Sequence, residues 1–332
     1  MTEELPGAAT ERSTAELLDS RDPLASFRSE FFHADPDQCY LDGNSLGKLP
    51  LATRDSVASF VTNEWGTELV EGWGHWIDEA QVAGDLLGSA TLGVGSGQTL
   101  VCDTTSMNFY QLAIAAIRSR PGRKTVIIDS ANFPTDRYIL EGIAEDLGLT
   151  LITLDTDGQG GPGAVTVSAE HERVTAEALA PHLNKDVALV TLQAINYRSG
   201  ARSELAEIQA AVTAAGAHML WDCSHAGGAI DLDFEGNKIK LAVGCTYKYG
   251  NSGPGSPAWL FVHTDLQDEL QVPIKGWFAQ EDQFVMGPWF EKARGIRGFQ
   301  VASPSIVGIR GVQASYDMIQ RAGIAEIEKK AR

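Results

Sequence analysis

Short apolar runs alternate along this chain with longer stretches in which apolar residues recur at helical spacing. Each run predicts a buried strand, because it is continuous over a strand's length and is bounded by turn residues. The predicted strands are Thr125–Asp129, 149–154, 187–195, His218–Asp222 and 241–245, with helices at 108–119, 136–147 and 203–215 between them. The alternation predicts an α/β fold, with a mainly parallel central sheet and helices on both faces. A last run, 257–263, predicts a further strand that we expect to be antiparallel.

Composition narrows the class of protein without pointing to one activity. The chain has 332 residues, 43% of them hydrophobic and 21% charged, which suffices for one large core or two lobes. The formal net charge of -18 disfavours nucleic-acid partners, which require basic patches. No apolar run approaches the roughly 20 residues of a membrane span, and the acidic start lacks the pattern of a secretory signal. We therefore expect a cytoplasmic protein without membrane or nucleic-acid partners.

Two polar residues stand at the ends of neighbouring predicted strands. Asp222 ends one strand within WDCSH, and Lys248 follows the next within CTYKYGNSGPGSP. Pyridoxal 5′-phosphate (PLP) chemistry requires a carboxylate that keeps the pyridine nitrogen protonated and a lysine that forms a Schiff base. Singly, the acid is more simply a helix cap and the lysine a solvated surface residue. Together they predict a PLP-dependent enzyme.

Two further segments offer side chains to such a cofactor. In CDTTSMNFYQL, Thr105 and Ser106 precede a helical run, where hydroxyls and free amides receive a phosphate. In SANFPTDRY, Phe133 offers a flat face for stacking on a ring, and Asp136 offers a polar partner. Taken alone, both segments are also consistent with plain helix caps.

Six motifs together resemble the kynureninase family, in the same order and at compatible spacing. They are YLDGNSLGKLP (40–50), NFPTD (132–136), NYRSG (196–200), WDCSHAGGAIDLD (221–233), TYKYGNSGPGSPA (246–258) and GWF (276–278). The resemblance runs from about Tyr40 to the end of the chain, and the first and fifth motifs are the most specific to the family. It implies the aspartate aminotransferase-like fold type I, PLP as the cofactor, a small-molecule amino-acid substrate and a homodimer.

The resemblance also implies a role for individual residues. Lys248 would form the internal aldimine and Asp222 would pair with the pyridinium nitrogen. The remaining residues implied for cofactor binding are Thr105, Ser106 and Tyr247 at the phosphate, Phe133 on the ring, Asp136 and His225 along the site, and Trp277 and Ser303 reaching in across a dimer interface. Ser45 would face the substrate, together with Ser303. His225 has the alternative interpretation of a buried imidazole satisfied within the core.

The implied reaction cleaves L-kynurenine, or a ring-substituted kynurenine such as 3-hydroxykynurenine, to an anthranilate and L-alanine. This reaction belongs to the kynurenine pathway of tryptophan catabolism and to NAD biosynthesis. Lys248 would move the α-proton, and Tyr247 would shuttle a proton at the carbonyl if nearby positive charge lowers its pKa. The sequence departs from the family at Ala279 and Gln280, where the family has Gly-His, at Ser303, in place of Asn or Thr, and at Gln193, in place of a smaller hydroxyl residue. A substituted kynurenine would suit such a pocket.

Two alternatives stay open. Another fold type I lyase, a cysteine desulfurase or C–S lyase, would need a cysteine on a mobile loop, and we expect Cys223 and Cys245 to be too confined at strand ends. A truncated PLP-binding protein with little activity is the other. The four cysteines lack CxxC spacing, so neither a metal site nor a disulfide framework is expected.

The domain boundaries follow from the motifs and the end of the resemblance. We expect an N-terminal tail and first helix at 1–35, a segment contributing to a small lobe and the active site at 36–75, and a large PLP-binding domain at 76–304. An amphipathic helix at 305–332 would connect to a C-terminal domain that the chain lacks, leaving the small lobe incomplete. The resemblance implies that this C-terminal domain supplies an arginine that binds the substrate's α-carboxylate. In this chain, Arg297 or Arg310 would have to take over that role.

Overall fold

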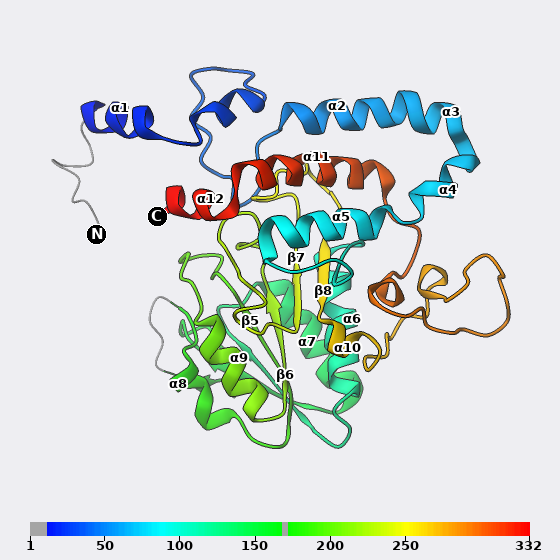
Figure 1. Cartoon of the computed structure of the whole chain (residues 1–332). Helices are drawn as coiled ribbons and strands as arrows, with labels where there is room; N and C mark the ends of the chain where they lie inside the picture. Colours follow the sequence, from blue (N-terminus) through cyan, green and yellow to red (C-terminus); the bar gives the residue numbers. More distant parts are fainter. Residues whose placement is uncertain (1–11, 168–171) are drawn as a thin grey trace.

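One sheet organises the fold. The computed structural model describes residues 12–167 and 172–332, and within them eight strands lie in the order β1-β8-β7-β6-β5-β2-β3-β4 (Figure 1). The strands are β1 (Thr99–Val101), β2 (Thr125–Asp129), β3 (Thr150–Asp155), β4 (Val165–Thr166), β5 (Val187–Gln193), β6 (His218–Asp222), β7 (Leu241–Gly244) and β8 (Trp259–Val262). Every predicted strand is present, with ends that move by no more than a few residues.

The strand directions confirm the predicted mixed sheet. Strands β2 to β7 pair in parallel, whereas β8 pairs antiparallel with both β7 and β1. All residues of β5, β6 and β7 are buried, which explains why these strands read as unbroken apolar runs. The large side chains Trp221 and Trp259 are fully enclosed in this core.

Helices cover the two faces of the sheet. The helices α6 (Thr105–Arg118) and α7 (Pro134–Leu147) pack side by side on one face, and α8 (Ala176–Leu179) and α9 (Leu205–Ala214) lie on the other (Figure 1). The three helices predicted between strands are therefore present. The short elements of this part are η5 (Ala180–His182), α10 (Thr264–Gln267), η6 (Trp277–Ala279) and η7 (Ile296–Phe299).

A second layer of helices joins the two ends of the described chain. Helix α11 (Ile306–Ala322) packs against α2 (Leu51–Ser59) and α5 (Glu79–Leu87) (Figure 1). The other elements of the N-terminal part are α1 (Arg12–Arg21), η1 (Ala25–Glu30), the π-helical η2 (Phe60–Trp65) and η4 (Gly88–Leu92), α3 (Gly66–Glu68), η3 (Leu69–Gly72) and α4 (Trp73–Trp76). Ion pairs from Arg321 to Glu30 and from Lys330 to Asp22 tie the last helices to the first segment.

The single helix predicted at 305–332 is wrong in one respect. The segment forms two helices, α11 and α12 (Ile324–Ala331), which are separated at Gly323. Gly323 has φ +79°, a left-handed conformation that glycine adopts without steric cost and that interrupts a helix. The domain boundaries at 35, 75 and 304 remain predictions, and the beginning of the predicted tail, residues 1–11, lies outside the described residues. Within the described ranges, no helix has the length and apolar character needed to cross a membrane.

Candidate active site

A small cavity lies where the carboxyl ends of the central strands meet the first turns of α6 and α7. Its position is that expected for a ligand of a parallel sheet. The cavity is lined by Thr105, Ser106, Phe133, Thr135, Asp136, Asp222, Ser224, Tyr247 and Lys248. Seven of these nine residues are predicted site residues, so the fold brings together side chains that are more than 100 positions apart in the sequence. Thr135 and Ser224 were missed, although both lie inside the motifs NFPTD and WDCSH.

Lys248 is buried beside an imidazole and an aromatic ring. Lys248 lies in the loop after β7, and only 9% of the residue is exposed. Nζ lies 2.7 Å from Nε2 of His225 and 5.5 Å from the centroid of the Phe133 ring. Burial and the positive charge of Lys248 lower the pKa of His225 to about 4, against an opposing effect of Asp222. The imidazole is therefore neutral at neutral pH and can accept a hydrogen bond from the lysine.

Two buried carboxyl groups stand next to each other in the cavity. Asp222 and Asp136 are 4% and 3% exposed. Burial, followed by the adjacent Asp222 carboxylate, raises the pKa of Asp136 well above its usual range. Asp222 Oδ1 accepts a hydrogen bond of 2.8 Å from the Ser224 amide, whereas Asp136 Oδ2 is buried without a donor. A pair of acids with an unused acceptor suits a cationic N–H group, such as a protonated pyridine nitrogen.

The N-terminus of α6 opens onto the same cavity. Thr104 caps the helix, and its Oγ1 accepts a hydrogen bond of 3.3 Å from the Met107 amide. The first amides of a helix have no intrahelical partner, and the helix dipole places partial positive charge there. Thr105 and Ser106 add hydroxyl groups at these positions. The arrangement is suited to receive a phosphate group.

Tyr247 lies in the cavity, but the condition set for its role as a proton shuttle, a pKa lowered by nearby positive charge, is not met. Burial is the main effect on this half-buried phenol, and it raises the pKa, with Cys245 and Asp222 acting in the same direction. The motif alone could not decide the direction of the shift, because neighbours on other strands and the degree of burial are not visible in it. The phenol is protonated at neutral pH and is a hydrogen-bond donor.

The loop with Ser45 docks directly on the lysine segment. The Gly47 amide donates a hydrogen bond of 2.8 Å to the Tyr247 carbonyl. A Cβ at Gly47 would lie 2.2 Å from the Lys248 carbonyl oxygen, so only glycine allows this approach. Ser45 itself is exposed and does not line the cavity. Asn44 of the same loop lines a neighbouring pocket of about 480 Å³, to which His225 and Tyr249 also contribute.

Trp277 and Ser303 are not brought to the cavity within one chain. Trp277 is 44% exposed, and its ring packs edge-on against Phe278 with centroids 4.5 Å apart. Ser303 is exposed. Their predicted contribution across a dimer interface stays a prediction.

The two arginines considered for carboxylate binding have other partners. Arg297 donates hydrogen bonds to Gln283 and to the carbonyls of Gln280 and Glu281. Arg310 forms ion pairs with Glu64 and Glu79. Gln193, noted as a departure from the family, donates a hydrogen bond of 2.9 Å to the Ala131 carbonyl and so ties the end of β5 to the loop after β2.

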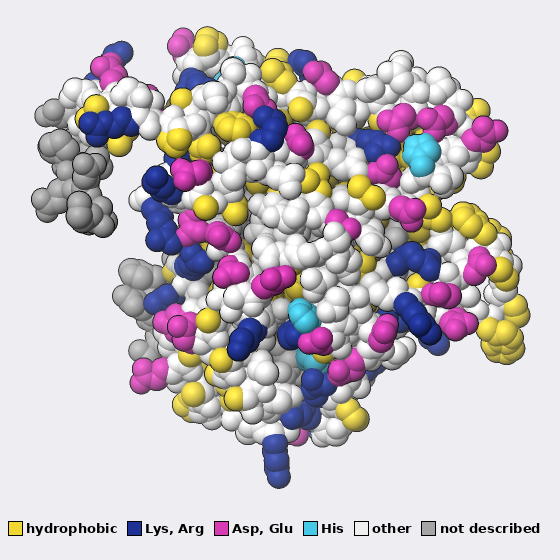
Figure 2. Space-filling model, in the orientation of Figure 1, with side chains coloured by type: hydrophobic (Ala, Val, Ile, Leu, Met, Phe, Trp, Pro, Cys, Tyr) yellow, Lys and Arg dark blue, Asp and Glu magenta, His cyan; other side chains and the backbone are white. Residues whose placement is uncertain are grey.

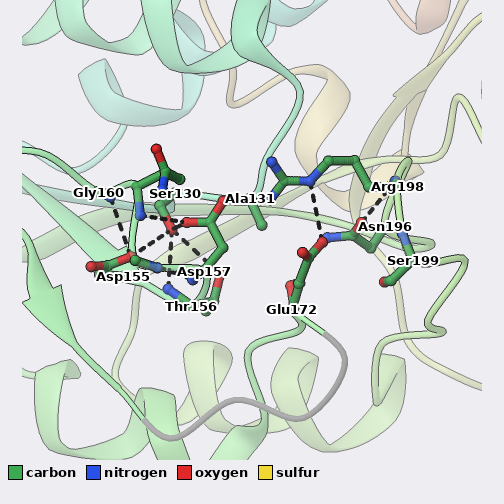
Figure 3. A network of polar contacts seen from close by, with 12 residues as sticks. Ser130, Ala131, Asp155, Thr156, Asp157, Gly160, Glu172, Asn196, Arg198 and Ser199 are labelled. Atoms are coloured by element: carbon green, nitrogen blue, oxygen red, sulfur yellow. Dashed lines mark hydrogen bonds and ion pairs between the residues drawn. The ribbon is translucent and has the colours of Figure 1, made fainter.

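A polar network beside the cavity joins four loops at the carboxyl edge of the sheet (Figure 3). Ser130, after β2, donates a hydrogen bond of 2.5 Å to Asp157, after β3. Arg198, after β5, pairs with both Asp157 and Glu172. Sequence reasoning missed this network because its charged partners are far apart in the chain and carry no spacing signal.

The fold and the cavity define a PLP-dependent enzyme of fold type I: a lysine after one central strand, an acid at the end of its neighbour, and a helix N-terminus between them. A family model described as aminotransferase class-V matches residues 97–332. The kynureninase of Deinococcus radiodurans is 34% identical over all of this chain and 77% of its own length. The kynureninase of Pseudomonas fluorescens is 33% identical over 97% of this chain and 74% of its own length. The chain belongs to the kynureninase family, within the class-V aminotransferases.

Solved structures confirm the fold. The cystine C–S lyase C-DES, in complex with its reaction product cysteine persulfide, superposes with a TM-score of 0.74 over 88% of this chain and 74% of that chain, at 19% identity. The cysteine desulfurase CsdA of Escherichia coli has a TM-score of 0.72, covering 90% of this chain and 73% of that chain, at 15% identity. At such identities the likeness concerns the fold alone.

Proposed function

We propose that this chain is a kynureninase-type hydrolase, which cleaves L-kynurenine or a ring-substituted kynurenine such as 3-hydroxykynurenine to an anthranilate and L-alanine. The observation that carries the proposal is the similarity to curated kynureninases, which extends over essentially the whole chain at about one third identity. Five of the six family motifs meet around the cavity in support of it, whereas GWF lies away from it within one chain. The reaction would belong to tryptophan catabolism.

The residues of the cavity fit PLP. Lys248 would bind its aldehyde carbon, and Asp222 would face the pyridine nitrogen, with Asp136, whose pKa is raised, beside it in the acid pair. The amides and hydroxyls of Thr105 and Ser106 would receive the phosphate, and Phe133 would cover one face of the ring. Bound there, PLP supplies an electron sink for the negative charge that develops on the substrate's carbon atoms.

Lys248 and Tyr247 are the proposed proton carriers. Lys248 would take the substrate's α-proton on Nζ, and the neutral His225 beside it would hold the amine in place through its Nε2 acceptor. Tyr247 would donate a hydrogen bond to the substrate's γ-carbonyl oxygen, because its raised pKa keeps the hydroxyl proton in place. One water molecule is consumed when the bond between the β- and γ-carbons breaks, so the products are the aryl carboxylic acid and L-alanine.

The experiment that tests the proposal is the release of anthranilate. The purified chain, supplied with PLP, is incubated with L-kynurenine and with 3-hydroxykynurenine, and the aryl product and L-alanine are both quantified. Lys248→Ala serves as the inactive control. Absence of both products with wild-type protein that binds PLP would reject the proposal.

The cysteine desulfurase alternative finds little support in the site. Cys102, Cys223 and Cys245 are buried, and burial raises the pKa of each thiol, which suppresses the reactive thiolate. Cys39 is exposed. Sulfide release from L-cysteine, measured in parallel with wild-type protein and Cys39→Ala, decides whether this activity is present.

A further inference from the structure

Tyr197 contacts both of the rings that surround Lys248. The centroids of the Tyr197 and Phe133 rings lie 5.4 Å apart, with the ring planes at 83°. On its other side, the Tyr197 ring lies 6.3 Å from the His225 ring. Since Phe133 and His225 each contact Lys248 Nζ, these four side chains form a closed circle of contacts.

The backbone on either side of Tyr197 is held firmly. Asn196 is 5% exposed, and its Oδ1 accepts hydrogen bonds from the amides of Arg198 and Ser199, at 2.9 and 3.0 Å. Asn196 Nδ2 donates to the Glu172 carbonyl at 3.1 Å (Figure 3). The short turn that carries Tyr197 is therefore fixed by a buried side chain at its start.

Arg198 completes this support. Its guanidinium pairs with Asp157 and Glu172, and the hydrogen bond that it donates to the Asp157 carboxylate is the main effect that raises the pKa of Arg198 (Figure 3). The same guanidinium lies 5.6 Å from the centroid of the Tyr197 ring, within the range of a cation–π contact. The neighbouring residues Asn196 and Arg198 thus hold Tyr197 in place, and its ring faces Phe133 and His225 at the lysine site.

We propose that Tyr197 is a positioning residue of the cofactor site, which acts by holding the rings of Phe133 and His225 in place around Lys248. This inference rests on the site proposed above. Phe133 is 39% exposed, so neighbouring side chains must define the orientation of its ring. An edge-to-face aromatic pair is directional and contributes beyond the area that it buries. The contacts are made by the ring of Tyr197, so its hydroxyl group is dispensable for this role.

The test compares Tyr197→Ala with Tyr197→Phe. Dissociation constants for PLP are measured by absorbance titration of the apoprotein, together with the pH midpoint of the bound cofactor's visible absorbance. Tyr197→Ala should weaken PLP binding on the order of 3- to 10-fold and shift the midpoint. Tyr197→Phe should restore both, because it keeps the ring. Tyr138→Ala, at an exposed tyrosine on α7, is the matched control and should change neither.

A double-mutant cycle shows whether Tyr197 acts through Phe133. The loss of PLP affinity in Phe133→Leu combined with Tyr197→Ala should be smaller than the sum of the two single losses, because the same contact is removed twice. Additive losses, or an unchanged affinity and midpoint in folded Tyr197→Ala, would overturn the proposal. Should Tyr197→Ala fail to fold by circular dichroism, Tyr197→Leu carries the same comparison.

The proposed site and the proposed positioning role fail in different ways. The site would be rejected before any comparison at Tyr197 if the wild-type protein bound no PLP. It would also be rejected if borohydride reduction still attached PLP covalently to the Lys248→Ala protein. A lack of kynurenine cleavage would reject the activity and leave the affinity comparison at Tyr197 intact.

Discussion

Lys248 and His225 are hydrogen-bonded to each other, with Nζ and Nε2 2.7 Å apart. They come from the loops that follow the parallel neighbours β6 and β7, so the pairing of the two strands places them together. The pKa of His225 is lowered to about 4, so the imidazole is neutral near pH 7 and Nε2 can accept a hydrogen bond from Lys248. The lysine is therefore oriented before any ligand binds.

Lys248→Ala should abolish the visible absorbance of protein-bound PLP and the borohydride-reducible link, since no other described lysine lines the cavity. Asp222→Ala should weaken PLP binding by at least about tenfold, because a buried charge-assisted hydrogen bond contributes on the order of 1.5–3 kcal/mol. Absorbance titration and mass spectrometry after reduction measure both effects. A reducible link in Lys248→Ala, or wild-type activity in Asp222→Ala, would contradict the assignment.

His225 should make the protein acid-sensitive. Its folded pKa of about 4 lies below the unfolded value of about 6.5, so the unfolded state binds the extra proton first as the pH falls. Stability is thus lost between about pH 6.5 and pH 4, and His225→Gln should reduce this loss on the order of 2 kcal/mol. Urea unfolding at pH 7 and pH 4.5 measures it.

His218 provides a comparison for His225. Burial also lowers its pKa to about 4, but it lies at the opposite end of β6, where Nε2 is 2.8 Å from Ser119 Oγ. His218→Gln should change the acid sensitivity in the same direction and leave the absorbance of bound PLP unchanged. An equal change in that absorbance in both variants would argue that His225 has no special relation to the site.

Much of this site could be predicted from the sequence because a parallel sheet gathers its strand ends. Once 218–222 and 241–245 read as buried strands, Asp222 and Lys248 had to meet at one edge, and the capped start of α6 had to face them. The signals were local: continuous apolar runs and turn residues. The resemblance to the family then assigned roles to the residues within the motifs.

The parts that escaped prediction depend on distant neighbours. The pairing of Arg198 with Asp157 and the ring contacts of Tyr197 join separate loops, and the raised pKa of Tyr247 follows from burial. The break at Gly323 was missed because the apolar spacing continues through it.

Asp129 should be a pH-dependent source of instability next to the site. Burial raises its pKa to about 7, with amide hydrogen bonds from Asn132 and Ala131 opposing the shift. The folded pKa lies above the unfolded value of about 3.9, so the folded state binds the extra proton and stability falls as the pH rises from about 4 to 7. Asp129→Asn should gain stability relative to wild type on the order of 2 kcal/mol over this interval. Denaturant curves at pH 5 and pH 8 test it, and a difference that does not depend on pH would contradict it.

We predict a homodimer in which Trp277 serves the partner's site. The loop after η6 projects from the body of the molecule (Figure 1), and hydrophobic side chains gather along it (Figure 2). Its residues Phe284, Met286 and Trp289 are 60%, 77% and 84% exposed. Such apolar exposure is typical of an interaction surface. Light scattering should give the dimer mass, and mixing Lys248→Ala with Trp277→Ala chains should restore part of the activity in mixed dimers. A monomeric mass without any complementation would refute shared sites.

Gly47→Ala should disturb the lysine site from outside. The added Cβ would meet the Lys248 carbonyl oxygen at 2.2 Å and the Asn251 Cα at 2.7 Å, and these backbone atoms cannot move away as the nearby Asn251 side chain could. The loop must therefore lift and lose the hydrogen bond from the Gly47 amide to Tyr247, at a cost of about 1–3 kcal/mol in unfolding free energy. Gly43→Ala in the same loop is the matched control, because its Cβ would meet nothing within 4 Å. Thermal unfolding and PLP affinity of the two variants should differ clearly. Equal values would show that the loop does not dock on the Lys248 segment in solution.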